Sequence, residues 1–359
     1  MKKFALTVIK IAVSVGLYVY IFSKIDLAHL WEILKEASPW YFVAAIGVYF
    51  LIQGLSAYRW YLLLKPLEIR VPYTKLLSFT LMGMFFNNFM PTGIGGDVFR
   101  IYYLRKQTRR LSPATASVFF DRDLGMAALL LIATLAATFT GMTFKGVLLA
   151  PIFGLILLAF AAVNFALFYR PTYNLLHRLL MLFKMKEADK RVEHLFESVN
   201  SYRGQWGLIA TTIAISMIVQ IGCSAVNILA ADAIGMKTQG GWINYLVFIP
   251  AIGLITMIPV SVNGMGWREF SYLVLFVSVG ASEAQATALA FLWLGVLVIT
   301  SLPGGIIYAL TGSRQKEPLP IDEDVIEPDA LAVQSVRSSN ERRAAVSAST
   351  STGEETVST

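Results

Sequence analysis

Charged residues are scarce in this chain: they make up only 15% of its 359 residues, whereas 56% are hydrophobic. Soluble domains carry about 25% charged residues, so the composition excludes an ordinary soluble protein and predicts an integral membrane protein. Cysteine is almost absent, because Cys223 is the only one and lies in an apolar run. A single cysteine excludes an intramolecular disulfide framework and a cysteine metal site, and is typical of a small packing residue.

Several catalytic and cofactor signatures are also missing. The three histidines have no HExxH or related spacing, and the chain has no P-loop and no Rossmann fingerprint. No nucleophile–base pair and no two-carboxylate acid–base site stands out in the sequence. We therefore predict no metal, no cofactor and no catalytic residues, and favour a transporter over an enzyme. The net charge of +7 indicates orientation in a membrane and not a surface for nucleic acid.

Long hydrophobic runs dominate what is present. About 20 apolar residues cross the hydrocarbon core as a helix, and such runs occur at residues 4–23, 40–64, 113–141, 146–169, 207–231 and 285–312. The first run follows two lysines, but it is long and ends without a small-residue cleavage site, so we predict an uncleaved span. Two more apolar stretches, 76–99 and 242–280, are interrupted by proline and glycine.

The two interrupted stretches carry the same motif. Residues 91–100 read PTGIGGDVFR and residues 259–268 read PVSVNGMGWR, so each has Pro first, Gly five positions later and Arg nine positions later. Non-helical backbone at membrane depth is tolerated only where it is buried in protein or lines a wet cavity. Broken apolar segments at matching places in two halves of a chain are typical of a transport site at a repeat interface.

Basic residues indicate how the segments are oriented, because they concentrate in cytoplasmic loops. The N-terminal lysines predict a cytoplasmic N-terminus. The basic cluster at 100–110 would lie outside if segment 76–99 crossed fully, so we predict that 76–99 enters from the cytoplasm and turns back at PTGIGG. Loop 170–206 is predicted to be cytoplasmic. Segment 242–280 then either dips in from the outside and returns, or makes two thin crossings.

The predicted fold is an all-α integral membrane protein with about six full spans plus two re-entrant Pro/Gly-broken helical hairpins. The two halves would have opposite orientations, which is an inverted-topology repeat. Residues 1–312 form the transmembrane domain, and both termini are cytoplasmic. Residues 313–359 are rich in Ser, Thr, Ala, Glu and Asp. They cannot bury enough apolar surface to fold alone, so we predict a disordered cytoplasmic tail.

Polar and charged residues gather around the two motifs and at one further place. The substrate-binding candidates are Asn87, Asn88, Pro91, Gly96, Asp97 and Arg100 in the first motif, Asn263, Gly264, Gly266, Arg268 and Glu269 in the second, and Asp121 with Arg122 near the start of span 113–141. Freed backbone N–H groups at the start of a half-helix form, together with an arginine, a cradle for an anion or phosphate. Arg59, within the second span, is expected to extend its head group to the inner face of the membrane.

These residues also carry a family resemblance. The segments FFNNFMPTGIGGDVFRIYYL, FFDRDLG and IPVSVNGMGWRE resemble three blocks of the lysylphosphatidylglycerol synthase transmembrane family, which is also described as flippase-like. The resemblance covers about residues 5–312. Its pattern falls on Asn88, Pro91, Thr92, Gly93, Asp97 and Arg100, on Asp121, Arg122 and Gly125, and on Pro259, Gly264, Gly266, Arg268 and Glu269. The family more often has Glu where this chain has Asp97.

The resemblance implies translocation of a lipid and not its aminoacylation. In the multiple peptide resistance factor, a membrane domain of this kind is joined to a soluble aminoacyl-transferase domain, whereas this chain continues into the segment 313–359. Some family members are tied to polyprenyl-phosphate or glycolipid pathways. The resemblance therefore leaves the lipid open.

We expect the protein to translocate a phospholipid or other phosphate-bearing lipid between the leaflets of a bacterial or archaeal plasma membrane. Arg100 and Arg268 would grip the phosphate from opposite sides of the midplane. The asparagines would hydrogen-bond the headgroup, while Asp97 and Glu269 would orient the arginines or recognise a cationic group. Expected partners are membrane lipids and a separate lipid-modifying enzyme. The alternatives are a membrane enzyme or accessory subunit acting on polyprenyl-linked glycolipids, and a secondary transporter of a small anion.

Overall fold

The computed structural model describes most of the chain, and the described residues all belong to one compact unit, Met1–Arg314. They are residues 2–89, 95–144, 146–169, 171–172, 196, 200–258 and 260–312. Several predicted features lie outside them: the turn at 90–94 with Pro91, the residue Pro259, most of the predicted cytoplasmic loop, and the predicted tail 313–359.

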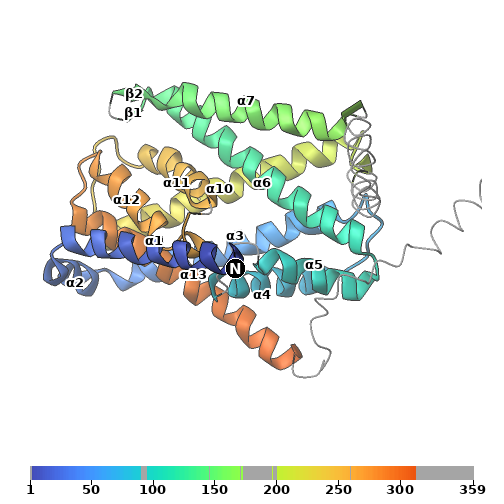
Figure 1. The fold of residues 1–359 in the computed structure, drawn as a ribbon, viewed down its shortest axis with the longest axis horizontal. Coiled ribbons are helices and arrows are strands. Elements are labelled where there is room, and N and C mark those ends of the chain that lie inside the picture. Colours follow the sequence, from blue (N-terminus) through green and yellow to red (C-terminus); the bar gives the residue numbers. More distant parts are fainter. Residues whose placement is uncertain are drawn as a thin grey trace, which may run out of the picture. The chain divides into compact units, whose positions relative to one another are not determined.

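Helices account for nearly all of the described residues (Figure 1), which confirms the all-α fold class. They are α1 (Lys2–Lys24), α2 (Leu27–Glu36), α3 (Pro39–Leu63), α4 (Tyr73–Phe89), α5 (Gly95–Thr108), α6 (Leu111–Thr140), α7 (Leu149–Phe168), α10 (Trp206–Ala233), α11 (Ile243–Met257), the 3-10 turn η1 (Val262–Gly264), α12 (Trp267–Val277) and α13 (Glu283–Gly312). A short antiparallel hairpin, β1 (Thr143–Phe144) with β2 (Val147–Leu148), joins α6 to α7.

Each apolar run of the sequence forms a helix, and the helical breaks fall at the two Pro/Gly motifs. The first break separates α4 from α5, and the second separates α11 from α12. Among the described residues, α3, α6, α10 and α13 are long and apolar enough to cross a membrane, whereas α7 and α11 are shorter apolar helices. The helix pair α1–α2 bends by 87°. The number of crossings therefore stays a prediction.

Helix α2 was not predicted from the sequence. It begins after Asp26, whose Oδ1 accepts hydrogen bonds from the backbone N–H groups of Ala28 (2.9 Å) and His29 (3.4 Å). Such a cap satisfies donors that the first turn of a helix leaves free. Leu30 is buried while Trp31 is 68% exposed, so α2 is amphipathic, and it packs against α13. This geometry suits a helix lying at a membrane surface.

The helix pairs that pack together repeat from one half of the chain to the other. Helix α4 packs on α13 as α11 packs on α6, and α5 packs on α6 as α12 packs on α13. Likewise α3 contacts α4 as α10 contacts α11, and α3 packs against α10, its own counterpart. Two structurally related halves produce this pattern. Helices α1 and α7 depart from it, because α1 contacts η1 and α12 whereas α7 packs on α6.

Three basic segments meet at one end of the helices. The hydroxyl of Tyr202 donates to the carbonyl of Leu63 at 2.8 Å, and Arg110 Nη1 donates to the carbonyl of Leu67 at 3.1 Å. At the same end, Lys75 Nζ donates to Gln107 Oε1 at 3.1 Å. Segments 64–75, 105–110 and 200–205 are thus neighbours. Other loops meet elsewhere, where the backbone N–H groups of Ser38 and Gln239 donate to the carbonyls of Ala233 and Val279.

Candidate functional site

The first helical break brings α5 back against α4 at two glycines. A Cβ on Gly96 would collide with the carbonyl of Gly83, and a Cβ on Gly83 would lie 3.0 Å from the carbonyl of Gly96. Only residues without a side chain allow the backbones to approach this closely. The start of α5 is held there by Asn87, whose Oδ1 accepts a hydrogen bond from the N–H of Gly96 at 2.9 Å.

One asparagine ties the two broken segments together. Asn263 Nδ2 in η1 donates to the backbone carbonyl of Asn87 at the end of α4, at 2.6 Å. Asn263 has a φ of 50°, a left-handed conformation that Asn tolerates better than most residues. Asn88 Nδ2 donates to the carbonyl of Leu297 in α13 at 3.0 Å. The two motifs, far apart in the sequence, therefore meet at the ends of α4 and η1.

At the second break, the buried carboxylate of Glu269 orients Arg268. Glu269 has no exposed side-chain surface, and its Oε2 accepts the N–H of Gly266 at 2.7 Å. Its Oε1 accepts from Arg268 Nη2 at 2.7 Å and from Nε at 3.1 Å. Gly264 and Gly266 have φ of 75° and 78°, and a Cβ on Gly266 would lie 3.0 Å from the carbonyl of Ser14 in α1. These residues build the turn and hold the arginine.

Asp121 in α6 is the centre of a buried ion-pair network. Its Oδ1 accepts from Arg59 Nε and pairs with Arg59 Nη2, both at 2.8 Å, and its Oδ2 accepts from Arg100 Nη2 at 2.8 Å. Arg59 Nη1 also donates to Ser216 Oγ in α10 at 2.7 Å. The prediction that Arg59 snorkels is therefore wrong: the side chain is buried and its donors are engaged inside the protein. The guanidinium of Arg100 lies 4.1 Å from the ring centroid of Trp60.

The next residue of α6 forms a second, more accessible ion pair. Arg122 makes a bidentate contact with Asp97 in α5, with Nε to Oδ2 at 2.8 Å and Nη2 to Oδ1 at 2.9 Å. Half of the Arg122 side-chain surface is accessible, compared with 8% for Arg100 and 14% for Arg268. Arg122 is thus the arginine of this group most open to a ligand.

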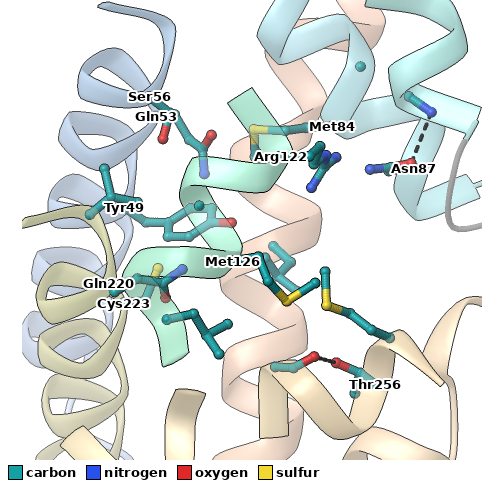
Figure 2. Close-up of a pocket in the computed structure, with 18 of the residues that line it drawn as sticks. Tyr49, Gln53, Ser56, Met84, Asn87, Arg122, Met126, Gln220, Cys223 and Thr256 are labelled. Atoms are coloured by element: carbon teal, nitrogen blue, oxygen red, sulfur yellow. Dashed lines mark hydrogen bonds between the residues drawn. The ribbon is translucent and has the colours of Figure 1, made fainter. Parts of the chain in front are cut away.

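These groups surround a cavity of about 470 Å³, shown in Figure 2. Of the predicted site residues, the cavity is lined by Asn87, Asn88, Gly96, Asp97, Arg100, Asp121, Arg122 and Arg268. The other predicted residues of the second motif do not line the cavity but form the turn next to Arg268: Asn263, Gly264, Gly266 and Glu269. Pro91 lies outside the described residues. The structure therefore brings three sequence motifs to one cavity between the two halves.

The cavity also has polar residues that the sequence analysis missed. Gln53 with Tyr49 comes from α3 and Gln220 from α10, whereas Arg122 and Asn87 come from α6 and α4 (Figure 2). Both glutamines stand inside apolar helices that are long enough to span a membrane. A polar side chain in such a helix is itself a signal of an internal site, and it would have identified them. Met84, Met126 and Met257 supply flexible apolar surface.

The electrostatics of the cavity favour an anion. Within the part of the chain that the structure describes, four arginines line it, namely Arg59, Arg100, Arg122 and Arg268, and three carboxylates contact them. One positive charge is in excess, inside a protein interior where charges interact strongly. Among the described residues, no group of three or more histidine, cysteine or acidic side chains could hold a metal ion. The arrangement can bind and orient a negatively charged group.

Several known proteins are similar to this chain in sequence. A UPF0104 membrane protein of Pyrococcus horikoshii is 25% identical over 302 residues, covering 77% of this chain and 88% of the relative. A UPF0104 membrane protein of Methanothermobacter thermautotrophicus is 32% identical over 106 residues, 29% of this chain and 31% of the relative. The profile described as "Lysylphosphatidylglycerol synthase TM region" matches residues 7–304, which include both broken helices and the cavity. This all-α membrane protein therefore belongs to the lysylphosphatidylglycerol synthase transmembrane-region family.

Proposed function

We propose that the protein moves a phosphate-bearing lipid between the two leaflets of the plasma membrane of a bacterium or archaeon. One observation carries the proposal: an arginine-rich cavity lies between two broken helical hairpins that come from equivalent places in the two halves. Transport sites of secondary transporters are built in this way, at the interface of structural repeats and from discontinuous helices. Membership of the family adds support, since its name refers to a phospholipid.

The dimensions of the cavity suit a headgroup. Its volume of about 470 Å³ lies within the range of roughly 300–1,000 Å³ found for small-molecule sites. The acyl chains would remain in the bilayer while the headgroup passes through the protein. The cavity combines charged and amide side chains with methionine and leucine surface, which suits the boundary between a headgroup and its chains.

The arginines would have different roles in binding phosphate. Arg122 and Arg268 would contact the phosphate oxygens, because each presents a guanidinium nitrogen that no described residue occupies. Arg100, which contacts Asp121 and Trp60, would add a further positive charge to the cavity. Asp97 and Glu269 would orient the arginines. Bidentate arginine contacts are among the strongest and most geometrically specific ways to hold a phosphate.

The proposed orientation places both termini in the cytoplasm. Segments 64–75, 105–110 and 200–205 meet at one end of the helices and carry a surplus of lysine and arginine. Cytoplasmic loops carry such a surplus. The sequence contains no nucleotide-binding motif, so movement would be passive, ion-coupled or driven by a partner, such as the enzyme that makes or consumes the lipid.

The test is a lipid-scrambling assay with purified protein in vesicles of phosphatidylcholine. Vesicles contain a trace of tail-labelled anionic phospholipid, and an impermeant quencher reports the fraction in the outer leaflet over time. The double variant Arg122→Gln/Asp97→Asn removes one ion pair without changing net charge, and Arg268→Gln removes the arginine of the second motif. We expect each to slow translocation at least about tenfold, the effect of losing roughly 1.4 kcal/mol of binding.

Lys75→Gln is the matched control, since Lys75 contacts Gln107 outside the cavity, and it should translocate like the wild type. Equal rates in the wild type, Lys75→Gln and both cavity variants would rule out a two-arginine lipid site.

A small soluble anion is a second candidate substrate, because the cavity is large enough for a headgroup-sized molecule that has no chains. Uptake of labelled phosphate or glycerol phosphate into the same vesicles, without lipid movement, would select it.

The third alternative, an enzyme acting on polyprenyl-linked glycolipids, is less supported. Each described carboxylate at the cavity contacts an arginine, so none is left free to contact a substrate as a general acid must.

A further inference from the structure

Every carboxylate oxygen around the cavity is already occupied by a donor from the protein. Asp121 Oδ1 accepts from Arg59 and Oδ2 from Arg100. Both oxygens of Asp97 accept from Arg122. Glu269 Oε1 accepts from Arg268, and Oε2 accepts from the N–H of Gly266. Among the described residues, the cavity therefore presents no unpaired carboxylate with which to bind a positively charged group.

Donors, in contrast, remain unused within the described part of the chain. Arg122 and Arg268 each engage Nε and Nη2 on a carboxylate, which leaves Nη1 without a hydrogen bond. Arg100 Nε is buried and has no hydrogen-bond partner among the described residues, and the same holds for the Thr80 hydroxyl. Both of these residues line the cavity. A buried unpaired donor carries a desolvation cost, and an anionic oxygen placed here would offset it.

Neutral polar groups line the cavity from two other helices. Gln53 and Tyr49 come from α3, and Gln220 comes from α10 (Figure 2). The side-chain amide of Gln220 makes no hydrogen bond with another described residue. A glutamine offers both donors and an acceptor, so it is matched to hydroxyl groups, which also donate and accept. It offers no charge to balance an ammonium group.

Resting on the lipid-translocation proposal above, we infer that the substrate headgroup is an anionic phosphate that bears hydroxyl groups and no ammonium group. The arginines hold the phosphate, and Gln53 and Gln220 hold the hydroxyls. A headgroup esterified with lysine adds two ammonium groups to the same phosphate. These would enter a cavity that already has an excess positive charge and no free carboxylate, where like charges disfavour one another. The cavity thus selects the unmodified anionic lipid over its lysyl ester.

The experiment compares four tail-labelled probes in the reconstituted vesicles: phosphatidylglycerol, phosphatidic acid, lysylphosphatidylglycerol and phosphatidylcholine. We expect phosphatidylglycerol to move fastest, and lysylphosphatidylglycerol and phosphatidylcholine to move at least about tenfold more slowly, as an uncompensated buried charge would produce. Lysylphosphatidylglycerol moving as fast as phosphatidylglycerol, or faster, would overturn the inference and leave lipid translocation intact. No movement of any probe above protein-free vesicles would instead overturn the translocation proposal.

Two variants test the inference at the residues that carry it. Gln220→Leu should reduce the preference for phosphatidylglycerol over phosphatidic acid, which lacks the glycerol hydroxyls. Gln220→Glu adds the missing carboxylate and should raise the rate of lysylphosphatidylglycerol relative to phosphatidylglycerol. An unchanged ratio of these two rates in Gln220→Glu contradicts the assignment.

Soluble glycerol phosphate, added in excess, distinguishes a lipid headgroup from a free phosphate as the substrate. Transport of glycerol phosphate without lipid movement would identify a soluble substrate.

Discussion

At the scale of single residues, Asp121 holds two arginines on one carboxylate. Removing one partner of a buried ion pair is strongly destabilising, because the other charge is left uncompensated. We expect Asp121→Asn to lower the free energy of unfolding by about 3 kcal/mol or more, measured by thermal unfolding in a mild detergent. Asp123→Asn, two positions later on the same helix and outside the cavity lining, should change it by less than about 0.5 kcal/mol. A shift below about 0.5 kcal/mol for Asp121→Asn as well would show that the network adds no net stability.

Asn263 combines a backbone role with a side-chain role, and two substitutions separate them. Glycine accepts its φ of 50° but loses the hydrogen bond to Asn87, which should cost about 1 kcal/mol. Alanine loses the bond and also strains the left-handed backbone, which should add about 1–2 kcal/mol. The expected order of melting temperature is therefore wild type, then Asn263→Gly, then Asn263→Ala. If the alanine and glycine variants melt together, the left-handed conformation is not required.

At the scale of helices, the close crossing of α4 and α5 depends on Gly83 and Gly96. A methyl group at Gly96 would collide with the Gly83 carbonyl, and overpacking of this kind costs about 1–3 kcal/mol. We expect Gly96→Ala to lower the melting temperature and to impair translocation, since the crossing positions Arg100 and Asp97. Gly47→Ala, in α3 where a Cβ meets nothing within 4 Å, should be neutral or raise stability by about 0.5–1 kcal/mol. A neutral result at Gly96 would mean that the hairpin rearranges freely.

The sequence predicted helices and their breaks well because both depend on local patterns. Apolar length determines where a span can form. Proline and glycine favour a break without enforcing one, since Pro250 and Pro303 lie inside α11 and α13. Helix α2 was missed although Asp26 is a good cap and Leu27, Leu30, Trp31 and Leu34 fall at helical spacing. It is too short to span a membrane, and its apolar residues are spaced along one face and do not form a long apolar run.

The pairing inside the site was less predictable, because it joins residues that are distant in sequence. Arg59 looked like an interfacial residue, yet it lies against Asp121, 62 positions away. Asp97 was expected to orient Arg100, its neighbour on α5, and its Oδ1 lies 3.6 Å from Arg100 Nη1. Its bidentate partner, however, is Arg122 on α6. Spacing in the sequence shows which residues share a face of one helix, but it does not show which residues of different helices contact each other. The choice among several arginines depends on how α3, α5 and α6 pack.

At the scale of the whole transmembrane unit, the repeated helix pairings explain why the cavity carries both motifs. Helices α3 and α10 occupy equivalent places in the two halves and pack on each other, and each contributes one glutamine to the cavity. The broken hairpins then approach from the two halves and touch at Asn87 and Asn263. A contact between the halves at the site itself is suited to a movement of one half against the other.

Orientation in the membrane is the last prediction, and the single native cysteine makes it testable. In a Cys223→Ala background, single cysteines replace exposed residues at the basic end of the helices, Lys65, Gln107 and Arg203. Others replace exposed residues away from that end: Lys35 in α2, Lys237 in a loop and Glu283 at the start of α13. The basic end should face the cytoplasm, because positively charged loops are retained there. An impermeant maleimide added to intact cells should therefore label positions 35, 237 and 283 but label 65, 107 and 203 only after the cells are opened. Labelling of 65 in intact cells would contradict the proposed orientation, whereas labelling of 107 without 65 would show that segment 76–99 crosses the membrane fully instead of turning back.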